Sequence, residues 1–438
     1  MSPSLRMIPS SAPIVGTVRP PGSKSITNRA LVCAALAKGT SRLTGVLDSQ
    51  DTRVMAEGLR ALGIGLDSDW AGERITVHGC DGRIPASAAT LDCAASGTTM
   101  RFLSAICGLG HGRYHLDGTP RMRQRPIGDL LAALRGLGID ATAESPGDCP
   151  PVVIRSVGLA GGATVVHGST SSQFASGLAM AGPCMPQGLE ITFAGTLVST
   201  PYLEMTRRVM AAFGADCHAT GPRHWRIAAG GYTGGDYRIE PDASAASYFL
   251  AAAALTGGRV TVAGLSRDSL QGDVDFCAAL ERMGCTVGWD DSGVTVAGRA
   301  ARGIDIDMNA ISDTVPTLAV VALFAGSPTT IRNVAHIRDK ETDRIGDLAR
   351  ELVRLGARVH ETHDGLTIDP VALHGAELST YDDHRMAMSL ALVGLRIDNV
   401  VIRDPACVGK TFPGYWATLA TLAGLDTAGW PPAFRPPA

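Results

Sequence analysis

The stretch Pro20–Ala30 reads Pro-Pro-Gly-Ser-Lys-Ser-Ile-Thr-Asn-Arg-Ala and precedes an apolar, alanine-rich helix expected over Ala30–Ala37. The two prolines end any preceding helix, and Ser23 is a typical N-cap residue. A helix N-terminus carries free N–H groups and partial positive charge, so the neighbouring Lys24 and Arg29 predict an anion site. A solvated loop with a capping box explains the same residues, and this stretch alone does not decide between the two.

The spacing of this stretch excludes a P-loop, which has the pattern Gly-x-x-x-x-Gly-Lys-Ser/Thr. Ser23 stands between Gly22 and Lys24, and Gly16 is one residue too far away. A nucleotide kinase of the P-loop class is therefore disfavoured.

The composition is that of a globular chain of two or three domains, with 438 residues, 45% hydrophobic and 18% charged. A net charge of -3 argues against bulk nucleic-acid binding, so any anion site must be local. The first eighteen residues lack the apolar segment of a secretory signal, and the longest apolar runs are too short to span a bilayer. We therefore expect a cytoplasmic protein.

Ten cysteines occur singly, without a Cys-x-x-Cys pair or a Cys/His cluster. This pattern argues against a zinc site. Several of the cysteines lie within apolar helical patterns, where a thiol packs as a small hydrophobic group. We expect most of them to be core residues.

One pattern, a polar turn that opens a helix of small apolar residues, occurs six times at intervals of about seventy residues. These inner helices are expected over residues 30–37, 100–109, 174–181, 245–255, 315–325 and 386–393. An amphipathic outer helix follows each of them and ends in a turn with glycine, the residue favoured just after a helix. The six turns contain Gly63, Gly138, Gly214, Gly284, Gly356 and Gly424.

Short β-like runs between the helices make each copy a small α/β unit of strands and two helices. The six units predict an α/β fold of two similar lobes, each of three repeated units, similar to an inside-out α/β barrel. We expect an N-terminal lobe at 22–239 and a C-terminal lobe at 240–438 together with 1–21. Helix N-termini that face a cleft between the lobes would favour a small, multiply anionic ligand. The alternative, in which the polar residues are only N-caps, stays open.

Four further segments gather charge near expected helix starts, at residues 120–127, 338–344, 381–386 and 405–413. The first has three arginines before a helix opened by Pro126, which favours oxyanion recognition. The second alternates in sign and, taken alone, is better explained as a salt-bridged helix face. The third puts His384 and Arg385 at the start of an inner helix, and the fourth puts Lys410 in a loop bounded by prolines.

Together these segments resemble the 5-enolpyruvylshikimate-3-phosphate synthase family. The matching motifs are Pro-Gly-Ser-Lys-Ser-x-x-Asn-Arg-Ala at 21–30, Arg-Pro-Ile at 125–127, Lys-Glu-Thr-Asp-Arg at 340–344, Asp-His-Arg-Met-Ala-Met at 383–388 and Lys-Thr-Phe-Pro at 410–413. They keep their order over essentially the whole chain. The resemblance implies two lobes that close around the ligands. It also implies transfer of the enolpyruvyl group of phosphoenolpyruvate to the 5-hydroxyl of shikimate 3-phosphate, with release of phosphate, in aromatic amino acid biosynthesis.

The resemblance also implies the site residues. The contacts to shikimate 3-phosphate are Lys24, Ser25, Arg29, Ser171, Ser172, Gln173, Ser199, Tyr202, Asp313 and Lys340. The contacts to phosphoenolpyruvate are Lys24, Gly97, Arg125, Gln173, Arg344, His384, Arg385 and Lys410. The catalytic residues are Lys24, Asp313 and Glu341. Asp313 acts at the hydroxyl, Glu341 at the methylene carbon and Lys24 at the departing phosphate. No metal and no organic cofactor is implied.

These residue types suit the chemistry. Phosphoenolpyruvate carries a carboxylate and a phosphate, for which arginines and lysines are fitting partners. Two carboxyl groups in different environments can divide the work of base and acid. We expect small-molecule substrates, a monomer, and no nucleic-acid or membrane partner.

Three positions depart from the family pattern. Ala95, Thr200 and His336 stand where Asn, Lys and Asn are common. The first departure removes an expected amide contact to phosphoenolpyruvate, and we still expect activity.

Two rival functions are weaker. The related transferase that acts on UDP-N-acetylglucosamine would need Lys-Asn near the N-terminus and a reactive Cys in the loop 121–125, whereas Lys24 is followed by Ser25 and this loop has no Cys. A non-catalytic anion-binding protein on the same fold would have lost catalytic groups, and these are all present.

Overall fold

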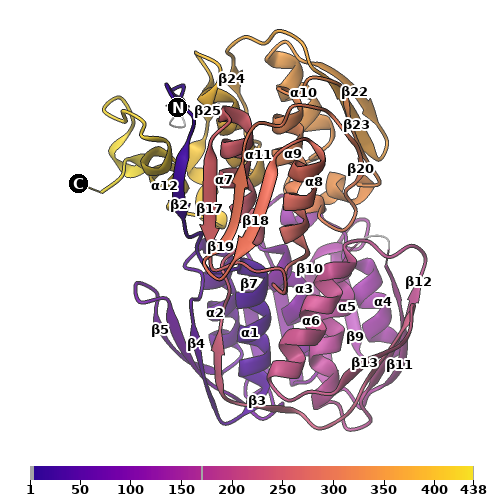
Figure 1. Ribbon diagram of the computed structural model, residues 1–438. Coiled ribbons are helices and arrows are strands. Elements are labelled where there is room, and N and C mark those ends of the chain that lie inside the picture. The colour runs from indigo at the N-terminus through magenta and orange to yellow at the C-terminus, as the bar shows by residue number, and fades with distance from the viewer. Residues whose placement is uncertain (1–3, 169–170, 438) are drawn as a thin grey trace. The chain divides into compact units, whose positions relative to one another are not determined.

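The computed structural model describes residues 4–168 and 171–437 (Figure 1). The lobe bounds expected from the sequence also include residues 1–3, 169–170 and 438, which lie outside the described residues. Contacts between Cα atoms divide the chain into two compact units. We call Gly22–Ile239 the N unit, and the residues up to Pro21 together with those from Glu240 onward the C unit.

Six buried inner helices begin at the expected polar turns. They are α1 (Lys24–Leu36), α3 (Gly97–Cys107) and α5 (Ser172–Ala181) in the N unit, and α7 (Ala243–Thr256), α9 (Val315–Ala322) and α11 (His384–Ala391) in the C unit. Five of them are preceded by an N-cap residue whose side chain accepts a hydrogen bond from a backbone N–H group. These N-cap residues are Ser23, Ser96, Ser171, Asp242 and Asp383. The start expected for the first helix, Ala30, was wrong, because the cap at Ser23 lets α1 begin at Lys24.

Six outer helices alternate with the inner ones. They are α2 (Gln50–Ala61), α4 (Gly128–Gly136), α6 (Thr200–Ala212), α8 (Phe276–Arg282), α10 (Gly346–Arg354) and α12 (Tyr415–Ala423). The glycine expected after each has a positive φ between 61° and 110°, a conformation that costs other residues strain. Pro126 does not open α4 as expected, since that helix begins two residues later, at Gly128.

The described residues of the N unit form three four-stranded sheets. The first has the order β16 (Asp236–Arg238), β4 (Thr40–Thr44), β6 (Arg74–His78), β5 (Gly65–Asp69). The second runs β7 (Ala88–Asp92), β8 (His111–Asp117), β10 (Cys149–Val157), β9 (Asp140–Ser145). The third runs β11 (Gly162–His167), β12 (Leu189–Ala194), β14 (His224–Ile227), β13 (Cys217–Gly221). The short strands β3 (Ala37–Lys38) and β15 (Tyr232–Thr233) also pair.

The C unit repeats this plan. One sheet has the order β18 (Thr286–Asp290), β19 (Gly293–Ala297), β17 (Arg259–Ala263), β2 (Val15–Val18). Another has the order β20 (Asp305–Asp307), β21 (Thr329–Arg332), β23 (Gly365–Asp369), β22 (Arg358–Thr362). A shorter sheet has the order β1 (Ser4–Arg6), β25 (Val401–Arg403), β24 (Glu377–Leu378). In every four-stranded sheet, a parallel pair at one edge is followed by antiparallel neighbours. The α/β repeat is confirmed.

Two edge strands come from distant parts of the chain. In the N unit, β16 pairs in parallel with β4, with Asp236 opposite Arg42. In the C unit, β2 pairs in parallel with β17, with Val15 opposite Arg259. The N-terminal segment therefore belongs to a C-unit sheet.

The inner helices pack within each unit. In the N unit α3 contacts α1 and α5, and in the C unit α9 contacts α7 and α11. Figure 1 shows α1, α3 and α5 inside the N unit, with β4 and β5 on one side and β11 and β12 on the other. The described strands form separate sheets and no closed barrel.

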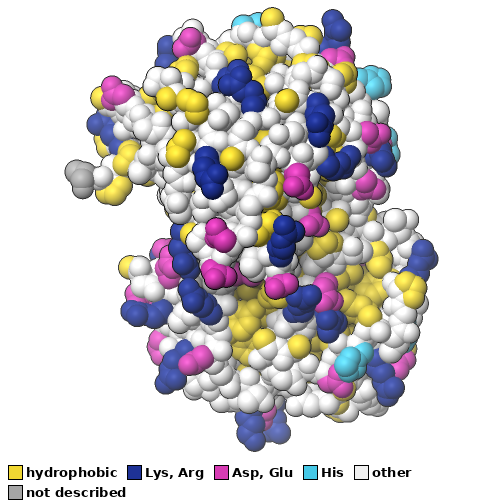
Figure 2. Space-filling model, viewed as in Figure 1, with side chains coloured by type: hydrophobic (Ala, Val, Ile, Leu, Met, Phe, Trp, Pro, Cys, Tyr) yellow, Lys and Arg dark blue, Asp and Glu magenta, His cyan; other side chains and the backbone are white. Residues whose placement is uncertain are grey.

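The described residues contain no helix both long and apolar enough to cross a membrane. On the face seen in Figure 2, Lys and Arg side chains are interspersed with Asp and Glu side chains. This mixture agrees with the small net charge of -3.

Candidate active site

The site residues expected from the sequence fall into two groups, one in each unit. The C-unit group contains Asp313, Lys340, Glu341, Arg344, His384, Arg385 and Lys410. The N-unit group contains Lys24, Ser25, Arg29, Gly97, Arg125, Ser171, Ser172, Gln173, Ser199 and Tyr202. Each group is described within its own unit.

Arg344 is the centre of the C-unit group. Its side chain is 2% exposed and donates hydrogen bonds to three carboxylates. The nitrogen–oxygen distances are 3.1 Å to Asp313, 2.8 Å to Glu341 and 2.7 Å to Asp383. Burial opposes its charged form, but the carboxylates outweigh burial, and the pKa of Arg344 is raised.

Each of the two carboxylates expected to transfer protons meets a second cation. Arg385 Nη2 lies 2.7 Å from Asp313 Oδ2, and Lys410 Nζ lies 2.7 Å from Glu341 Oε1. The two carboxylate side chains are only 17% and 13% exposed, so these charges interact through a partly dry environment. Asp313 lies in the 3-10 helix η4 (Ser312–Thr314), Arg385 in α11 and Lys410 in the 3-10 helix η7 (Pro405–Lys410). Glu341 lies in the irregular stretch before α10.

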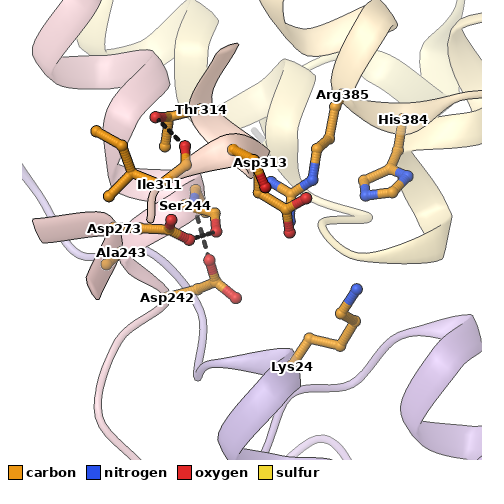
Figure 3. Close-up of polar contacts among 12 residues, drawn as sticks. Lys24, Asp242, Ala243, Ser244, Asp273, Ile311, Asp313, Thr314, His384 and Arg385 are labelled. Atoms are coloured by element: carbon orange, nitrogen blue, oxygen red, sulfur yellow. Dashed lines mark hydrogen bonds and ion pairs between the residues drawn. The ribbon is translucent and has the colours of Figure 1, made fainter. Parts of the chain in front are cut away.

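His384 is the first residue of α11 and is 1% exposed. Figure 3 shows its ring beside Arg385, whose guanidinium points at Asp313. Burial, followed by the charge of Arg385, lowers the pKa of His384 well below its ordinary value, so the ring is neutral. Neither ring nitrogen has a hydrogen-bond partner among the described residues.

The segment 338–344 is not the salt-bridged helix face that its charge pattern favours. The 3-10 helix η5 (Ala335–Asp339) ends just before Lys340, and the chain then runs irregularly to α10. Arg338 pairs with Asp343 and Glu361, at 2.7 and 2.8 Å. In the irregular stretch Lys340 is half-buried, and Glu341 pairs with Arg344.

In the N-unit group, two guanidinium groups lie against Gly97, the first residue of α3. A Cβ atom added there would lie 2.7 and 2.8 Å from the terminal nitrogens of Arg125, and closer still to Arg101 Nη1. Arg101 also donates to Gln173 Oε1 at 3.0 Å. Both arginines are buried. Of the three arginines at 121–125, Arg123 instead pairs with Asp117 at the surface.

Arg29 is 2% exposed, and its hydrogen bonds go to protein acceptors. It donates to Thr206 Oγ1 at 2.7 Å and to the backbone oxygens of Ser25 and Tyr202 at 2.9 and 3.3 Å. Its guanidinium also lies over the rings of Phe102 and Tyr202. Burial lowers the pKa of Arg29 to about 10, and the side chain stays charged near neutral pH. These contacts tie α1 to α3 and α6.

Lys24, the first residue of α1, has a side chain that is 12% exposed. Its Nζ lies 3.6 Å from the carboxylate of Asp51, which is buried in the first turn of α2. The other expected N-unit residues sit at helix starts, since Ser171, Ser172 and Gln173 open α5, and Ser199 and Tyr202 open α6. Ser25 is half-buried in α1.

Sequence reasoning missed three buried residues that hold expected site residues in place. Asp383 lay in a quoted motif without a role, although it is the N-cap of α11 and holds Arg344. Arg101 is a charged residue in the apolar inner helix α3 and contacts Gln173. Asp51 lies two residues after the N-cap Ser49 of α2 and pairs with Lys24. The signal that could have found Arg101 is a charge in a pattern that otherwise predicts burial.

His336, one of the departures from the family pattern, is 7% exposed in the C unit. Its Nε2 lies 3.0 Å from Ser312 Oγ, next to Asp313 in the chain. Burial, followed by the charge of Lys340, lowers the pKa of His336 to about 4. Within residues 4–168 and 171–437, no group of three or more His, Cys, Asp or Glu side chains could hold a metal ion.

Comparison with known proteins identifies relatives of this chain. The family model of EPSP synthase (3-phosphoshikimate 1-carboxyvinyltransferase) matches residues 8–419. The 3-phosphoshikimate 1-carboxyvinyltransferase of Nostoc punctiforme is 48% identical over 92% of this chain and 95% of its own length. That of Methanoculleus marisnigri is 46% identical over 93% and 97%. The chloroplastic protein of Brassica napus is 43% identical over 93% and 83%.

Solved structures show the same fold. The EPSP synthase of Acinetobacter baumannii matches with a TM-score of 0.78 and 27% identity, over 97% of this chain and 98% of its own. The enolpyruvyl transferase NikO of Streptomyces tendae matches with a TM-score of 0.73 over 96% and 98%, and at 21% identity this likeness concerns the fold alone. The resemblance seen in the motifs is thereby confirmed, and the chain belongs to the EPSP synthase (3-phosphoshikimate 1-carboxyvinyltransferase) family.

Proposed function

We propose that this protein transfers the enolpyruvyl group of phosphoenolpyruvate to the 5-hydroxyl of shikimate 3-phosphate and releases phosphate. Membership of the transferase family supports the reaction type. The observation in the molecule that carries the proposal is the contact of Arg344 with both Asp313 and Glu341. One buried cation thus connects the two carboxylates that the reaction needs as base and acid.

The ion pairs of the C-unit group suggest how substrate binding prepares these carboxylates. Arg385 and Lys410 neutralise Asp313 and Glu341. The carboxylate and phosphate of phosphoenolpyruvate compete for the same cations, because they accept the same charge-assisted hydrogen bonds. Each cation that turns to the substrate leaves its carboxylate with a higher proton affinity.

The carboxylates then divide the chemistry. Asp313 accepts the proton of the 5-hydroxyl as its oxygen attacks C2 of phosphoenolpyruvate, and Glu341 donates a proton to the methylene carbon. Loss of phosphate and of a methyl proton from the resulting tetrahedral intermediate restores the double bond. Lys24 balances the charge of the departing phosphate, and Arg125 beside Gly97 holds an anionic group of phosphoenolpyruvate.

The remaining residues follow the same division. The shikimate 3-phosphate contacts are proposed at Lys24, Ser25, Arg29, Ser171, Ser172, Gln173, Ser199, Tyr202, Asp313 and Lys340. Arg29 differs from the others because its guanidinium already binds Thr206, so its contribution is to fix the position of α1. We propose further that the N and C units are lobes that close on a shared cleft, and that the enzyme is a cytoplasmic monomer.

The experiment that tests the function measures phosphate release with shikimate 3-phosphate and phosphoenolpyruvate, for the wild type, Lys24→Ala and Lys38→Ala. Lys38 is an exposed lysine in β3 and serves as the matched control. We expect release that needs both substrates, collapses in Lys24→Ala and persists in Lys38→Ala. Absence of release from folded wild-type protein would overturn the proposal, and UDP-N-acetylglucosamine would then be tried as the acceptor.

A further inference from the structure

A third carboxyl group, Asp273, lies near Asp313 and belongs to none of the motifs. It sits in the 3-10 helix η3 (Gly272–Asp275) of the C unit and is 4% exposed. Ser244 Oγ, in the first turn of α7, donates a hydrogen bond to Asp273 Oδ2. Figure 3 shows the Asp273 carboxyl against Ser244, with Asp242 and Asp313 in the same neighbourhood.

The position of Asp273 is fixed by Gln271, two residues earlier in the chain. Gln271 Oε1 accepts the backbone N–H of Ala243 at 2.9 Å, and Gln271 Nε2 donates to the backbone oxygen of Pro241 at 2.7 Å. Both contacts are buried and tie η3 to the start of α7. Asp273 therefore has little freedom to turn away from the site.

Charged groups from three elements face Asp273. They are Asp242 at the start of α7, Asp313 in η4 and Arg385 in α11. Burial, followed by the negative charge of Asp313, raises the pKa of Asp273 to about 6. Asp313 itself faces Arg344 and Arg385 at hydrogen-bond distance, and the neutral ring of His336 lies near it.

Electrostatic interaction between two titrating groups is reciprocal, so whatever Asp313 does to the proton affinity of Asp273, Asp273 does to that of Asp313. This matters because two guanidinium groups stabilise the ionised form of Asp313 and make it a weak base. The buried negative charge of Asp273 counteracts the two guanidinium groups, because it favours the protonated form of Asp313.

We propose that Asp273 is a positioning residue for the base, whose buried carboxyl group offsets the guanidinium groups of Arg344 and Arg385 and keeps Asp313 able to accept a proton. The proposal rests on the assignment of Asp313 as the base in the proposed function. Asp273 touches no reacting atom. It acts through Asp313 by charge, and Ser244 holds the carboxyl group in place.

The test is a pH titration of the ligand-free, full-length protein labelled with ¹³Cγ-aspartate and followed by carbon NMR. Signals are assigned by their loss in Asp273→Asn and Asp313→Asn. In Asp273→Asn we expect the titration midpoint of Asp313 to fall by about one pH unit, because a like charge is removed. In Asp313→Asn the midpoint of Asp273 should fall by a similar amount.

Asp275→Asn is the matched control, because Asp275 is an exposed carboxylate in the same 3-10 helix. It should leave both midpoints in place. If Asp273→Asn fails to fold, the Asp313→Asn arm measures the same interaction from the other side. An unchanged Asp273 midpoint in folded Asp313→Asn overturns the proposal.

Kinetics then separates this inference from the proposed function. In Asp273→Asn we expect the acid limb of the kcat/KM profile for shikimate 3-phosphate to move down by about one pH unit, while KM for phosphoenolpyruvate changes little. A shift seen by NMR together with full activity of Asp313→Asn would refute Asp313 as the base and leave the charge interaction intact. Loss of activity without any shift would refute the inference alone.

Discussion

Arg344 and Asp383 make a two-point contact within the C unit. Arg344 Nε lies 2.7 Å from Asp383 Oδ2, and Nη2 lies 3.1 Å from Asp383 Oδ1. Asp383 is completely buried and also accepts the backbone N–H of Arg385 at 2.8 Å as the N-cap of α11. One carboxylate thus fixes Arg344 and Arg385, two of the three arginines expected at phosphoenolpyruvate.

This contact predicts that Asp383→Ala is severely damaging. The change leaves the buried Arg344 without its closest carboxylate and removes a helix cap, so we expect the free energy of unfolding to fall by about 3 kcal/mol. KM for phosphoenolpyruvate should rise at least about tenfold, as the arginines lose their orientation. Denaturant unfolding and steady-state kinetics measure the two effects. Asp382→Asn, at the exposed neighbouring carboxylate, is the control, and equal behaviour of the two variants would contradict the prediction.

The two arginines at Gly97 predict a selective effect of Gly97→Ala. The added methyl group would meet Arg125 at 2.7 Å, so the guanidinium groups must shift. We expect KM for phosphoenolpyruvate to rise about tenfold or more, with little change in KM for shikimate 3-phosphate. Gly136→Ala is the matched control, because a Cβ there has its nearest neighbour at 3.9 Å. Equal effects on both substrates would show that the shift is not confined to the phosphoenolpyruvate contacts.

His336 predicts a pH dependence of stability. Its pKa is lowered by burial from 6.5 to about 4, so between these values the unfolded chain binds a proton that the folded chain does not. His336 therefore does not change the free energy of unfolding above pH 6.5, and it lowers that free energy as the pH falls from 6.5 toward 4. Between pH 6.5 and 4.5, the free energy of unfolding of His336→Asn should fall by about 2 kcal/mol less than that of the wild type. Urea unfolding across this range measures it, and parallel curves for the two proteins would refute the prediction.

From the burial of the cysteines, we expect their thiols to react slowly in the native protein. Seven of the ten are buried, and Cys80, Cys184 and Cys407 are half-buried. Burial raises the pKa of Cys184 and Cys407 to about 12 and raises that of Cys80, so few thiolates exist at pH 8. Labelling with a chromogenic disulfide should be slow in the native protein and should reach ten thiols after unfolding. A fast thiol whose modification abolished activity would favour the UDP-N-acetylglucosamine transferase.

Much of the fold could be predicted from the chain because its repeat is marked by local chemistry. A polar cap, a run of small apolar residues and a glycine after the outer helix are each determined by a few neighbouring residues. Gly63 and Gly356, for example, both have a φ near 87°. Helix starts were less predictable, since Lys24 to Arg29 look polar but belong to α1, which is capped by Ser23.

The parts of the site that could not be predicted depend on contacts between distant residues. Arg338 and Arg344 belong to one alternating run, yet one pairs with Glu361 and the other with Asp383. Nothing local distinguishes them, because burial decides which charge needs a partner. Asp273 was missed for the same reason, as its relation to Asp313 arises only when two 3-10 helices meet α7.

The pairing of Val15–Val18 with Arg259–Ala263 has a consequence for the order of events during synthesis. The N unit is one continuous stretch, and its last edge strand, Asp236–Arg238, finds Arg42–Thr44 already made. The strand Val15–Val18, which precedes the N unit, must instead wait until Arg259–Ala263, which follows the N unit, has been synthesised. Val15–Val18 is therefore made before the N unit but pairs only after it, and the N unit can fold while this strand is still unpaired.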